Sequence, residues 1–512
     1  MISRVNSAVC NGITGEPVIA ETDLSNGLPQ MHIVGLPSTM VMESKDRIKS
    51  AILNSGYEYP RRRITVNLTP AGIRKTGAHL DLPIAVGILT AMRYISTGNV
   101  SRYGIIGELS LEGRVLPVEG VLPMILGMKK RGIRQFMIPA ANLPEALLAE
   151  EIRVCGVDSL SDCVQKIHEG SGAWADSKPA FSQMNNVLES KPEIDFSDIR
   201  GQESAKRAAV IAAAGNHGLF LMGNPGCGKT MLARRISTIL PPMTRQEIIE
   251  DTIIYSVMGK VDPAEGGIRK RPFRMPHHSI GRSGLIGGGI WPIPGEVTLA
   301  HNGVLFLDEV SEFKREVLES LRIPIEDHTI THFRNGQAYQ YPCRFLLVMA
   351  ANPCPCGFNG DPDHECRCSF VQRENYRRKL SGAMLERVDI MVNMEKVQYK
   401  DLKGRDPAAV SSGELRRQVT DARAFAAATG RKKISGELND KEVRQLELSA
   451  EAERFMSSAY DKLHLSPRTY IKALRVARTI ADLDQSPRIE IQHISESLSY
   501  RMALYDFENG AE

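Results

Sequence analysis

The stretch that decides the fold is Gly223-Asn224-Pro225-Gly226-Cys227-Gly228-Lys229-Thr230, which fits the pattern G-x-x-x-x-G-K-S/T. A short apolar run, residues 219–222, precedes it and is expected to form a buried parallel strand. The glycines allow backbone N–H groups to curl around an anion, and residues 231–236 continue as a helix whose N-terminus faces that anion. This order of strand, loop and helix predicts that the eight residues bind the phosphates of ATP.

The residue types assign a role to each part of this site. Lys229 is expected to reach the β- and γ-phosphates, and the Thr230 hydroxyl to bind Mg²⁺. A second apolar run, residues 304–307, ends in Asp308 and Glu309. Asp308 would hold the Mg²⁺, and Glu309 would orient and polarise the attacking water. The alternative is a glycine-rich turn with an unrelated Asp-Glu pair, and the order of strand, loop and helix disfavours it.

A further apolar strand is expected at residues 343–352, and it ends in Asn352. In an open parallel sheet the carboxyl ends of the strands face the ligand. Asn352 is therefore expected beside the γ-phosphate, where its amide can help to hold the water. Without the glycine loop, Asn352 would be read as an ordinary polar residue at a strand end.

Length and composition describe a protein of several domains. A chain of 512 residues is too long for one core, so two to four domains are expected. The hydrophobic content of 42% and charged content of 24% are ordinary, and a net charge of +4 does not itself indicate nucleic-acid binding. No signal-peptide pattern opens the chain, and no apolar run approaches the ~20 residues that span a bilayer. We expect a cytoplasmic protein without disulfides or membrane contact.

The pattern of elements changes along the chain. Residues 1–170 alternate short strands with helices, including a helix at 43–55, a buried helix at 81–92 and a hairpin around Glu112-Gly113. Residues 171–194 have the composition of a linker. An α/β pattern covers residues 195–393, and the remainder, 394–512, is helical. The helices of that last part are expected at residues 413–429, 440–463, 467–483 and 491–502.

Four stretches resemble the magnesium-chelatase-like branch of AAA+ ATPases. They are residues 224–230, 302–309, 350–357 and 380–390. The whole chain resembles the ComM (YifB) family within that branch. The resemblance implies an α/β fold: a Lon-protease-like α+β domain (1–170), an AAA+ P-loop core (195–393) and a C-terminal helical lid (394–512). It also places Asn352 at the sensor-1 position.

The same resemblance gives roles to two arginines. Arg387, in Leu-Glu-Arg-Val-Asp, matches the arginine finger that is donated to the site of the neighbouring subunit. A guanidinium there would offset charge on the transferring phosphoryl group. Arg468 matches the sensor-2 arginine of the lid. The family has Phe where this chain has Val388, and by its sequence alone Arg387 would be read as a solvated surface residue. A finger that acts between subunits implies a ring, and the family predicts a homo-hexamer.

The resemblance to Lon raises the question of peptidase activity. Residues 75–82 align with the stretch that carries the Lon nucleophile, and His79 falls at the serine position. Residues 120–126 align with the stretch that carries the lysine, and Leu122 falls there. Leucine neither accepts a proton nor activates a hydroxyl. We therefore expect the fold of the protease domain without its activity.

Four cysteines lie within fifteen positions, as Cys354, Cys356, Cys366 and Cys368. Four thiolates can surround Zn²⁺ tetrahedrally, and such a closed site is structural because it has no open position. The C-x-C spacing is shorter than the usual C-x₂-C, and His364 is an alternative ligand. Four free thiols on a surface loop are the other alternative.

Two segments are candidates for contact with DNA. Residues 328–341 alternate and have Asn-Gly at their centre, which predicts a hairpin with Arg334 at its tip. Residues 279–294 contain three consecutive glycines, which favour a mobile loop. Basic clusters lie near both, although basic runs are often merely solvated. They comprise Arg269, Lys270, Arg271 and Arg274 before the glycines, and Arg373, Arg377, Arg378 and Lys379 after the cysteines.

The combined expectation is an ATPase that works as a hexameric DNA translocase or helicase. The family resemblance implies branch migration on single-stranded and branched DNA in homologous recombination during natural transformation (competence), with recombination proteins as further partners. The alternative is a chelatase-like or MoxR-like ATPase that remodels a protein partner. Salt-sensitive DNA binding would favour the first, and stimulation only by a partner protein would favour the second.

Overall fold

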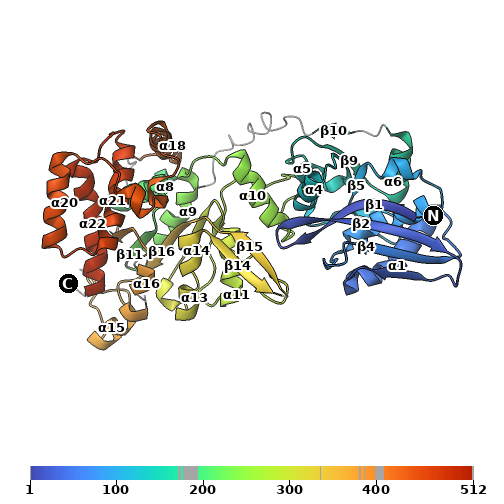
Figure 1. The fold of residues 1–512 in the computed structure, drawn as a ribbon. Coiled ribbons are helices and arrows are strands. Elements are labelled where there is room, and N and C mark those ends of the chain that lie inside the picture. The colour runs from blue at the N-terminus through green and yellow to red at the C-terminus, as the bar shows by residue number, and fades with distance from the viewer. Residues whose placement is uncertain are drawn as a thin grey trace. The chain divides into compact units, whose positions relative to one another are not determined.

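The computed structural model describes residues 2–170, 174–176, 194–334, 336–361, 363–379, 382–385, 387–397 and 409–509. The chain divides into two compact units, each drawn in Figure 1. The N-terminal unit comprises Met1–Ser190 and Thr244–Arg269, and the C-terminal unit comprises Lys191–Met243 and Lys270–Glu512. The linker expected at 171–194 lies largely outside the described residues.

The N-terminal unit is built on a mixed sheet of eight strands. β1 (Ile2–Asn11) and β2 (Thr14–Ser25) form a long antiparallel hairpin. The strand order is β10-β9-β8-β5-β1-β2-β4-β3. The other strands are β3 (Met31–Val34), β4 (Arg63–Thr69), β5 (Tyr103–Ile105), β8 (Gln135–Pro139), β9 (Arg153–Val157) and β10 (Ala175–Asp176).

The helices of this unit follow the apolar pattern of the sequence. α2 (Asp81–Ala91) is buried along its whole length, which confirms the expected buried helix. α1 (Thr39–Asn54) starts where the Ser38 side chain accepts a hydrogen bond from the Val41 N–H. The hairpin expected around Glu112-Gly113 is formed by β6 (Glu108–Leu109) and β7 (Val115–Leu116). α3 (Thr97–Val100), α4 (Val121–Lys130), α5 (Leu143–Ala146) and α6 (Leu160–Glu169) complete the unit.

One helix joins the N-terminal unit from a distant part of the sequence. α10 (Arg245–Ser256) falls inside the range assigned above to the ATPase core, yet it belongs to the N-terminal unit and packs on α4. The Ser256 hydroxyl donates to Glu145 Oε1 at 2.5 Å, and the Gly120 N–H donates to the Ser256 carbonyl at 3.2 Å. Gly266 approaches Pro144 so closely that a β-carbon there would lie 2.4 Å from the proline ring. These contacts are long-range, so no local pattern signals them.

The C-terminal unit has a parallel sheet of five strands in the order β12-β13-β16-β11-β17. Every neighbouring pair is parallel, and β11, β13 and β16 are buried throughout. This confirms the strands expected at residues 219–222 and 304–307; the strand expected at 343–352 is present but begins only at Leu346. The strands are β11 (Leu219–Gly223), β12 (Phe273–Arg274), β13 (Val304–Leu307), β16 (Leu346–Ala351) and β17 (Ile390–Met394).

Helices α8 (Glu203–Gly215) and α9 (Lys229–Ile239) pack on this sheet. The antiparallel pairing of β14 (Thr329–Arg334) with β15 (Gln337–Pro342) confirms the expected hairpin, and Asn335 of its turn lies outside the described residues. Shorter helices carry the connections. They are α11 (Arg282–Ile286), α12 (Glu296–Leu299), α13 (Arg315–Glu319), α14 (Arg322–Asp327), α15 (Phe370–Lys379) and α16 (Gly382–Leu385).

The last part of the chain is helical, as expected, with α18 (Ser412–Ala428), α21 (Pro467–Leu483) and α22 (Ile491–Asn509). The single helix expected at 440–463 is wrong. It divides into α19 (Asp440–Val443) and α20 (Ala450–Lys462), because Ser449 caps a new helix and its N–H donates to the Ile489 carbonyl. Among the described residues, no helix has the length and apolar character needed to cross a membrane.

Candidate active site

The glycine loop joins β11 to α9 in the conformation that its sequence requires. Gly226 has φ 80° and Gly228 has φ 98°, values that residues with a side chain rarely adopt. α9 begins at Lys229 immediately after Gly228, so its N-terminal N–H groups open onto the loop. This is the geometry in which backbone donors and the helix dipole bind phosphate.

Lys229 is held at the mouth of the loop. Its Nζ donates to the carbonyl oxygens of Gly223 and Asn224, the latter at 3.0 Å, and to Asn352 Oδ1 at 3.0 Å. Burial lowers the pKa of Lys229 from its ordinary value. The contact with Asn352 brings the predicted sensor amide beside the predicted phosphate-binding ammonium.

Thr230 and Asp308 also meet. The Thr230 hydroxyl donates to Asp308 Oδ2 at 2.8 Å, so a hydroxyl and a carboxylate lie together where the sequence predicts Mg²⁺. Both are oxygen ligands of the kind that Mg²⁺ prefers. Asp308 follows β13, and Thr230 lies in α9, which follows β11; with β16 between them, these parallel strands have their carboxyl ends at one edge of the sheet.

Glu309 follows Asp308 in a left-handed conformation with φ 48°. Its side chain is 58% exposed, so the carboxylate is accessible to water. His278 lies beside it, with Nδ1 3.8 Å from Glu309 Oε2. Sequence reasoning missed His278, although the pair His277-His278 in front of the glycine segment was a signal for a polar site.

Arg387 and Arg468 lie together. The side chain of Arg387 is 3% exposed, whereas that of Arg468 is 49% exposed. Both pair with Glu326 Oε1, at 2.6 Å and 3.3 Å. They line a cavity of 870 Å³, and none of the described residues in its wall belongs to the glycine loop. Sequence reasoning missed Glu326, because an acidic residue in a short helix has no motif of its own.

A buried ionic group supports the segment that follows Arg387. Lys472 Nζ, from α21, lies 2.7 Å from Asp389 Oδ1, and His217 Nδ1 lies 3.3 Å from Oδ2. Burial opposes ionisation of Asp389, but Lys472 and His217 outweigh it and hold its pKa well below the usual range. The Arg501 guanidinium donates to the Val388 carbonyl at 2.7 Å. The lid helices therefore fix the backbone next to Arg387.

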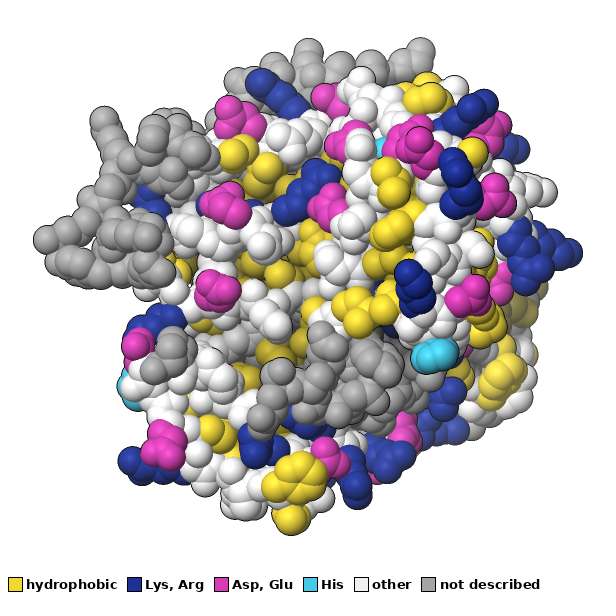
Figure 2. Space-filling model, turned by 90° about the vertical axis from the view of Figure 1, so that its left-hand side faces the viewer, with side chains coloured by type: hydrophobic (Ala, Val, Ile, Leu, Met, Phe, Trp, Pro, Cys, Tyr) yellow, Lys and Arg dark blue, Asp and Glu magenta, His cyan; other side chains and the backbone are white. Residues whose placement is uncertain are grey.

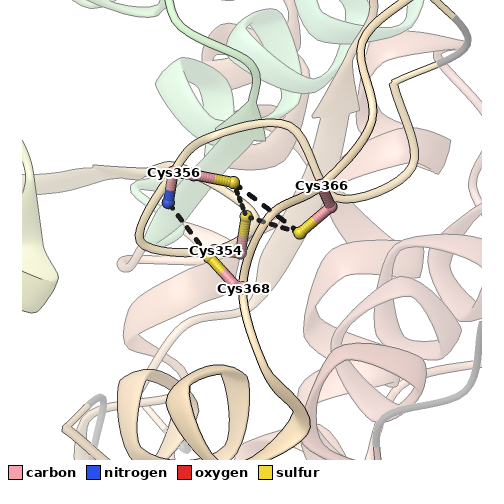
Figure 3. Close-up of side chains that lie close together, drawn as sticks. All are labelled: Cys354, Cys356, Cys366 and Cys368. Carbon is pink, nitrogen blue, oxygen red and sulfur yellow. Dashed lines mark hydrogen bonds between the residues drawn. The ribbon is translucent and has the colours of Figure 1, made fainter.

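The four cysteines converge (Figure 3). Cys354 Sγ lies 3.3 Å from that of Cys356 and 3.7 Å from that of Cys366, and the latter two sulfurs are 3.6 Å apart. Cys368 Sγ accepts from the Cys356 N–H at 3.4 Å, and all four sulfurs lie within 4.8 Å of one another. Sulfurs around a tetrahedral zinc with bonds of about 2.3 Å would be roughly 3.8 Å apart. The donor set therefore fits a structural Zn²⁺.

The predicted DNA elements contact each other. Arg334 Nε donates to the Gly289 carbonyl at 3.3 Å, and the Tyr341 hydroxyl donates to the Pro292 carbonyl at 2.6 Å. Gly288 and Ile293 pair across the glycine loop, which is thereby a closed turn. Ile290 and Phe333 are strongly exposed, at 77% and 73%. The loop and the hairpin thus form one projection, which exposes Arg334, Ile290 and Phe333.

Several arginines of the two basic clusters form hydrogen bonds or ion pairs with other residues of the fold. Arg271 donates to the carbonyls of Pro241 and Asn302, and Arg274 forms a bidentate pair with Glu296. Arg373 donates to Asn359 Oδ1 at 2.9 Å.

Arg377 and Arg378 of α15 both pair with Glu374, and Arg378 is the more exposed of the two. On the face of the C-terminal helices, basic and acidic side chains are interspersed among the described residues (Figure 2).

In the N-terminal unit, the two positions aligned with the Lon dyad are buried. His79 Nε2 lies 3.1 Å from the Ala8 carbonyl oxygen, and burial lowers the pKa of His79 to about 4. Leu122 is completely buried, and its N–H donates to Glu145 Oε1 at 2.8 Å.

Comparisons with known proteins match family models to residues of both units. The family of the magnesium chelatase subunit ChlI matches residues 195–402, its C-terminal part matches 409–501, and a further ChlI family matches 20–142. Competence protein ComM of Haemophilus influenzae is 39% identical over 502 residues, covering 98% of this chain and 97% of that protein. The uncharacterized protein YifB of Escherichia coli is 38% identical with the same coverage.

A weaker match links the chain to a protease. Lon protease of Mycolicibacterium smegmatis is 26% identical over 181 residues, which is 32% of this chain and 23% of that protein. The strong matches extend over both units and include the glycine loop, the acidic strand end and the lid. The chain belongs to the ComM/YifB family of magnesium-chelatase-like AAA+ ATPases.

Proposed function

We propose that this protein hydrolyses ATP in a homo-hexameric ring and uses the energy to move along DNA during homologous recombination. The observation that carries the ATPase part is the convergence of Lys229, Thr230, Asp308 and Asn352 at the carboxyl ends of adjacent parallel strands. The DNA part is supported by the projection at Arg334 and by the name of the relative called competence protein ComM.

The contacts support a definite division of roles. Lys229 and the loop N–H groups would hold the β- and γ-phosphates, and Thr230 and Asp308 would hold Mg²⁺, which offsets the charge of the phosphate oxygens. Glu309 would polarise the attacking water, and Asn352 would keep it in line. The glycine loop does not line the cavity at Arg387 and Arg468. Both arginines would therefore act on the ATP of a neighbouring subunit, and Arg387 would leave Glu326 to do so.

The experiment that tests the DNA part compares ATPase rates without DNA and with single-stranded, duplex and branched DNA. We expect stimulation by single-stranded and branched DNA. We also expect affinity to fall with salt, with a slope of roughly −0.7 to −0.9 for each phosphate contact. Arg334→Ala should lower the stimulation several-fold and leave the basal rate intact, because Arg334 contacts Gly289 rather than the phosphate loop.

Arg454→Ala, which changes an exposed arginine of α20, is the matched control and should behave like the wild type. No DNA binding at low salt with nucleotide present would contradict the proposal. Stimulation by a protein partner alone would support the remodelling alternative instead.

We also propose that the cysteine cluster holds one structural Zn²⁺. Elemental analysis of protein purified without added metal should find about one zinc per chain. A folded, metal-free sample would contradict this assignment. Cys227→Ser, which changes a cysteine outside the cluster, should retain the metal.

A further inference from the structure

The cysteine loop lies directly against the phosphate loop. Asn224 Nδ2 donates to Asp361 Oδ2 at 2.5 Å, which joins the second residue of the phosphate loop to the middle of the cysteine loop. A β-carbon on Gly357 would lie 2.7 Å from the ring of Pro225. The backbone of the cysteine loop therefore packs on the phosphate loop next to the hydrogen bond.

Asp361 is held on its other side by the cysteine loop itself. Its Oδ1 accepts from the N–H groups of Asp363 at 2.7 Å and His364 at 3.0 Å, on the way to Cys366. Although it lies in a surface loop, its side chain is only 4% exposed. One carboxylate oxygen thus binds the cysteine loop and the other binds the phosphate loop.

The same segment also supports Asn352. Asn352 stands two residues before Cys354, and the Tyr376 hydroxyl of α15 donates to its carbonyl at 3.1 Å. Arg373 of the same helix donates to Asn359 in the cysteine loop. The segment therefore begins at Asn352, passes through the four cysteines, and returns to the Asn352 carbonyl at Tyr376.

We propose that Asp361 is a positioning residue that keeps the phosphate loop in its binding conformation through Asn224, and that a metal in the cysteine cluster keeps Asp361 in place. The inference rests on the proposed ATP and zinc sites and is independent of DNA. Without a metal, four thiols do not hold a loop of this length closed, and the order of the loop is lost. Nucleotide affinity should therefore depend on metal occupancy.

The first test measures the Kd of a fluorescent ATP analogue with Mg²⁺ on the purified full-length chain. Asp361→Ala removes the acceptor and should raise the Kd about tenfold, since hydrogen bonds to charged groups are among the stronger ones. Asp361→Asn keeps an acceptor and should raise it by less. Asp363→Asn is the matched control, because that side chain is exposed and pairs with Lys396, and it should leave the Kd unchanged. If Asp361→Ala is poorly folded, Asn224→Ala tests the same contact from the phosphate loop.

The second test combines the variant with removal of the metal. Stripping zinc with a chelator, followed by dialysis into Mg²⁺, should raise the Kd of the wild type at least as much as Asp361→Ala does, because the packing of Gly357 on Pro225 is lost as well. Stripping Asp361→Ala should raise its Kd by a smaller factor than stripping raises that of the wild type, because both changes break the contact between Asp361 and Asn224. Readdition of Zn²⁺, followed by elemental analysis, should restore the wild type only.

The outcomes separate this inference from the proposed function. Equal Kd values for the wild type and Asp361→Ala would overturn the role of Asp361, and additive effects of stripping and substitution would overturn the metal link. A chain that binds no zinc at all would also overturn that link. Wild type that binds no more nucleotide than Lys229→Ala would instead refute the proposed ATPase.

Discussion

Each unit of the molecule has one place that aligns with the active site of an enzyme family, and the two places differ in the side chains that they contain. At the glycine loop of the C-terminal unit, an ammonium, a hydroxyl, carboxylates and an amide meet at the edge of the sheet, and Glu309 is open to water. At the Lon-like positions of the N-terminal unit, a buried histidine contacts a backbone carbonyl and a leucine is fully enclosed. We expect catalysis at the first place, where polar groups remain accessible. We expect a structural role for the second, where the aligned residues are buried.

The largest effect should come from the residue that acts between subunits. Arg387→Ala should still bind ATP but hydrolyse it about 10³-fold more slowly, because an arginine finger contributes at least that much to phosphoryl transfer. Mixing Arg387→Ala with Lys229→Ala should restore part of the activity, since interfaces with both intact residues can form. Normal hydrolysis by Arg387→Ala alone would place the finger elsewhere.

Glu309→Gln comes next and should lower ATP hydrolysis by about 10²–10³ while nucleotide binding is kept, since one well-placed catalytic group contributes about this much. Glu312→Gln is the control, because Glu312 lies in the short 3₁₀ turn that follows Glu309 and not directly at the end of β13. Steady-state rates and Kd values of both variants decide the matter. Wild-type turnover of Glu309→Gln would remove it from the water-activating role.

The N-terminal unit should resist conversion into a peptidase. The double change His79→Ser and Leu122→Lys should give no cleavage of casein. It should instead destabilise the unit by about 3 kcal/mol or more, because an unpaired charge would be buried at a fully enclosed position. Peptidase activity in this variant would mean that only the residue types at positions 79 and 122, and not the burial of these positions, prevent catalysis. Leu122→Met, which keeps the volume, should cost less than about 1.5 kcal/mol.

The smallest effect concerns pH. The pKa of His79 is 6.5 in its ordinary state and about 4 in the fold, so between these values the unfolded chain binds a proton that the folded chain does not. The stability that neutral His79 contributes is present above pH 6.5 and falls by about 1.4 kcal/mol per pH unit as pH drops toward 4. His79→Gln should lack this loss, so its stability relative to wild type should rise on acidification.

Burial raises the pKa of Asp81 to about 6, which acts in the opposite direction in both proteins and cancels in the difference. Urea unfolding can be followed through Trp174, which stacks on Tyr103 in the N-terminal unit, with Trp291 changed to Phe. A pH-independent difference between His79→Gln and the wild type would contradict the buried neutral histidine.

The parts of the molecule that sequence could predict are those whose signals are local. The glycine loop, the apolar strands and the hairpin at residues 329–342 each carry their pattern within a few residues. The parts that it missed depend on residues far apart in the chain. Glu326 pairs with Arg387 and Arg468, and Asp361 with Asn224, only once the fold brings them together. The break at Ser449 likewise depends on a contact with Ile489.

The placement of α10 has a consequence for how the protein is made. The N-terminal unit requires residues 244–269, which are synthesised only after β11, the glycine loop and α9 of the other unit. Domains usually fold in order as the chain leaves the ribosome. Here the first unit has to wait, with the surface of α4 that receives α10 uncovered, while the start of the second unit emerges. The synthesis of the two units is therefore interleaved along the chain, because neither unit is formed by one continuous segment of sequence.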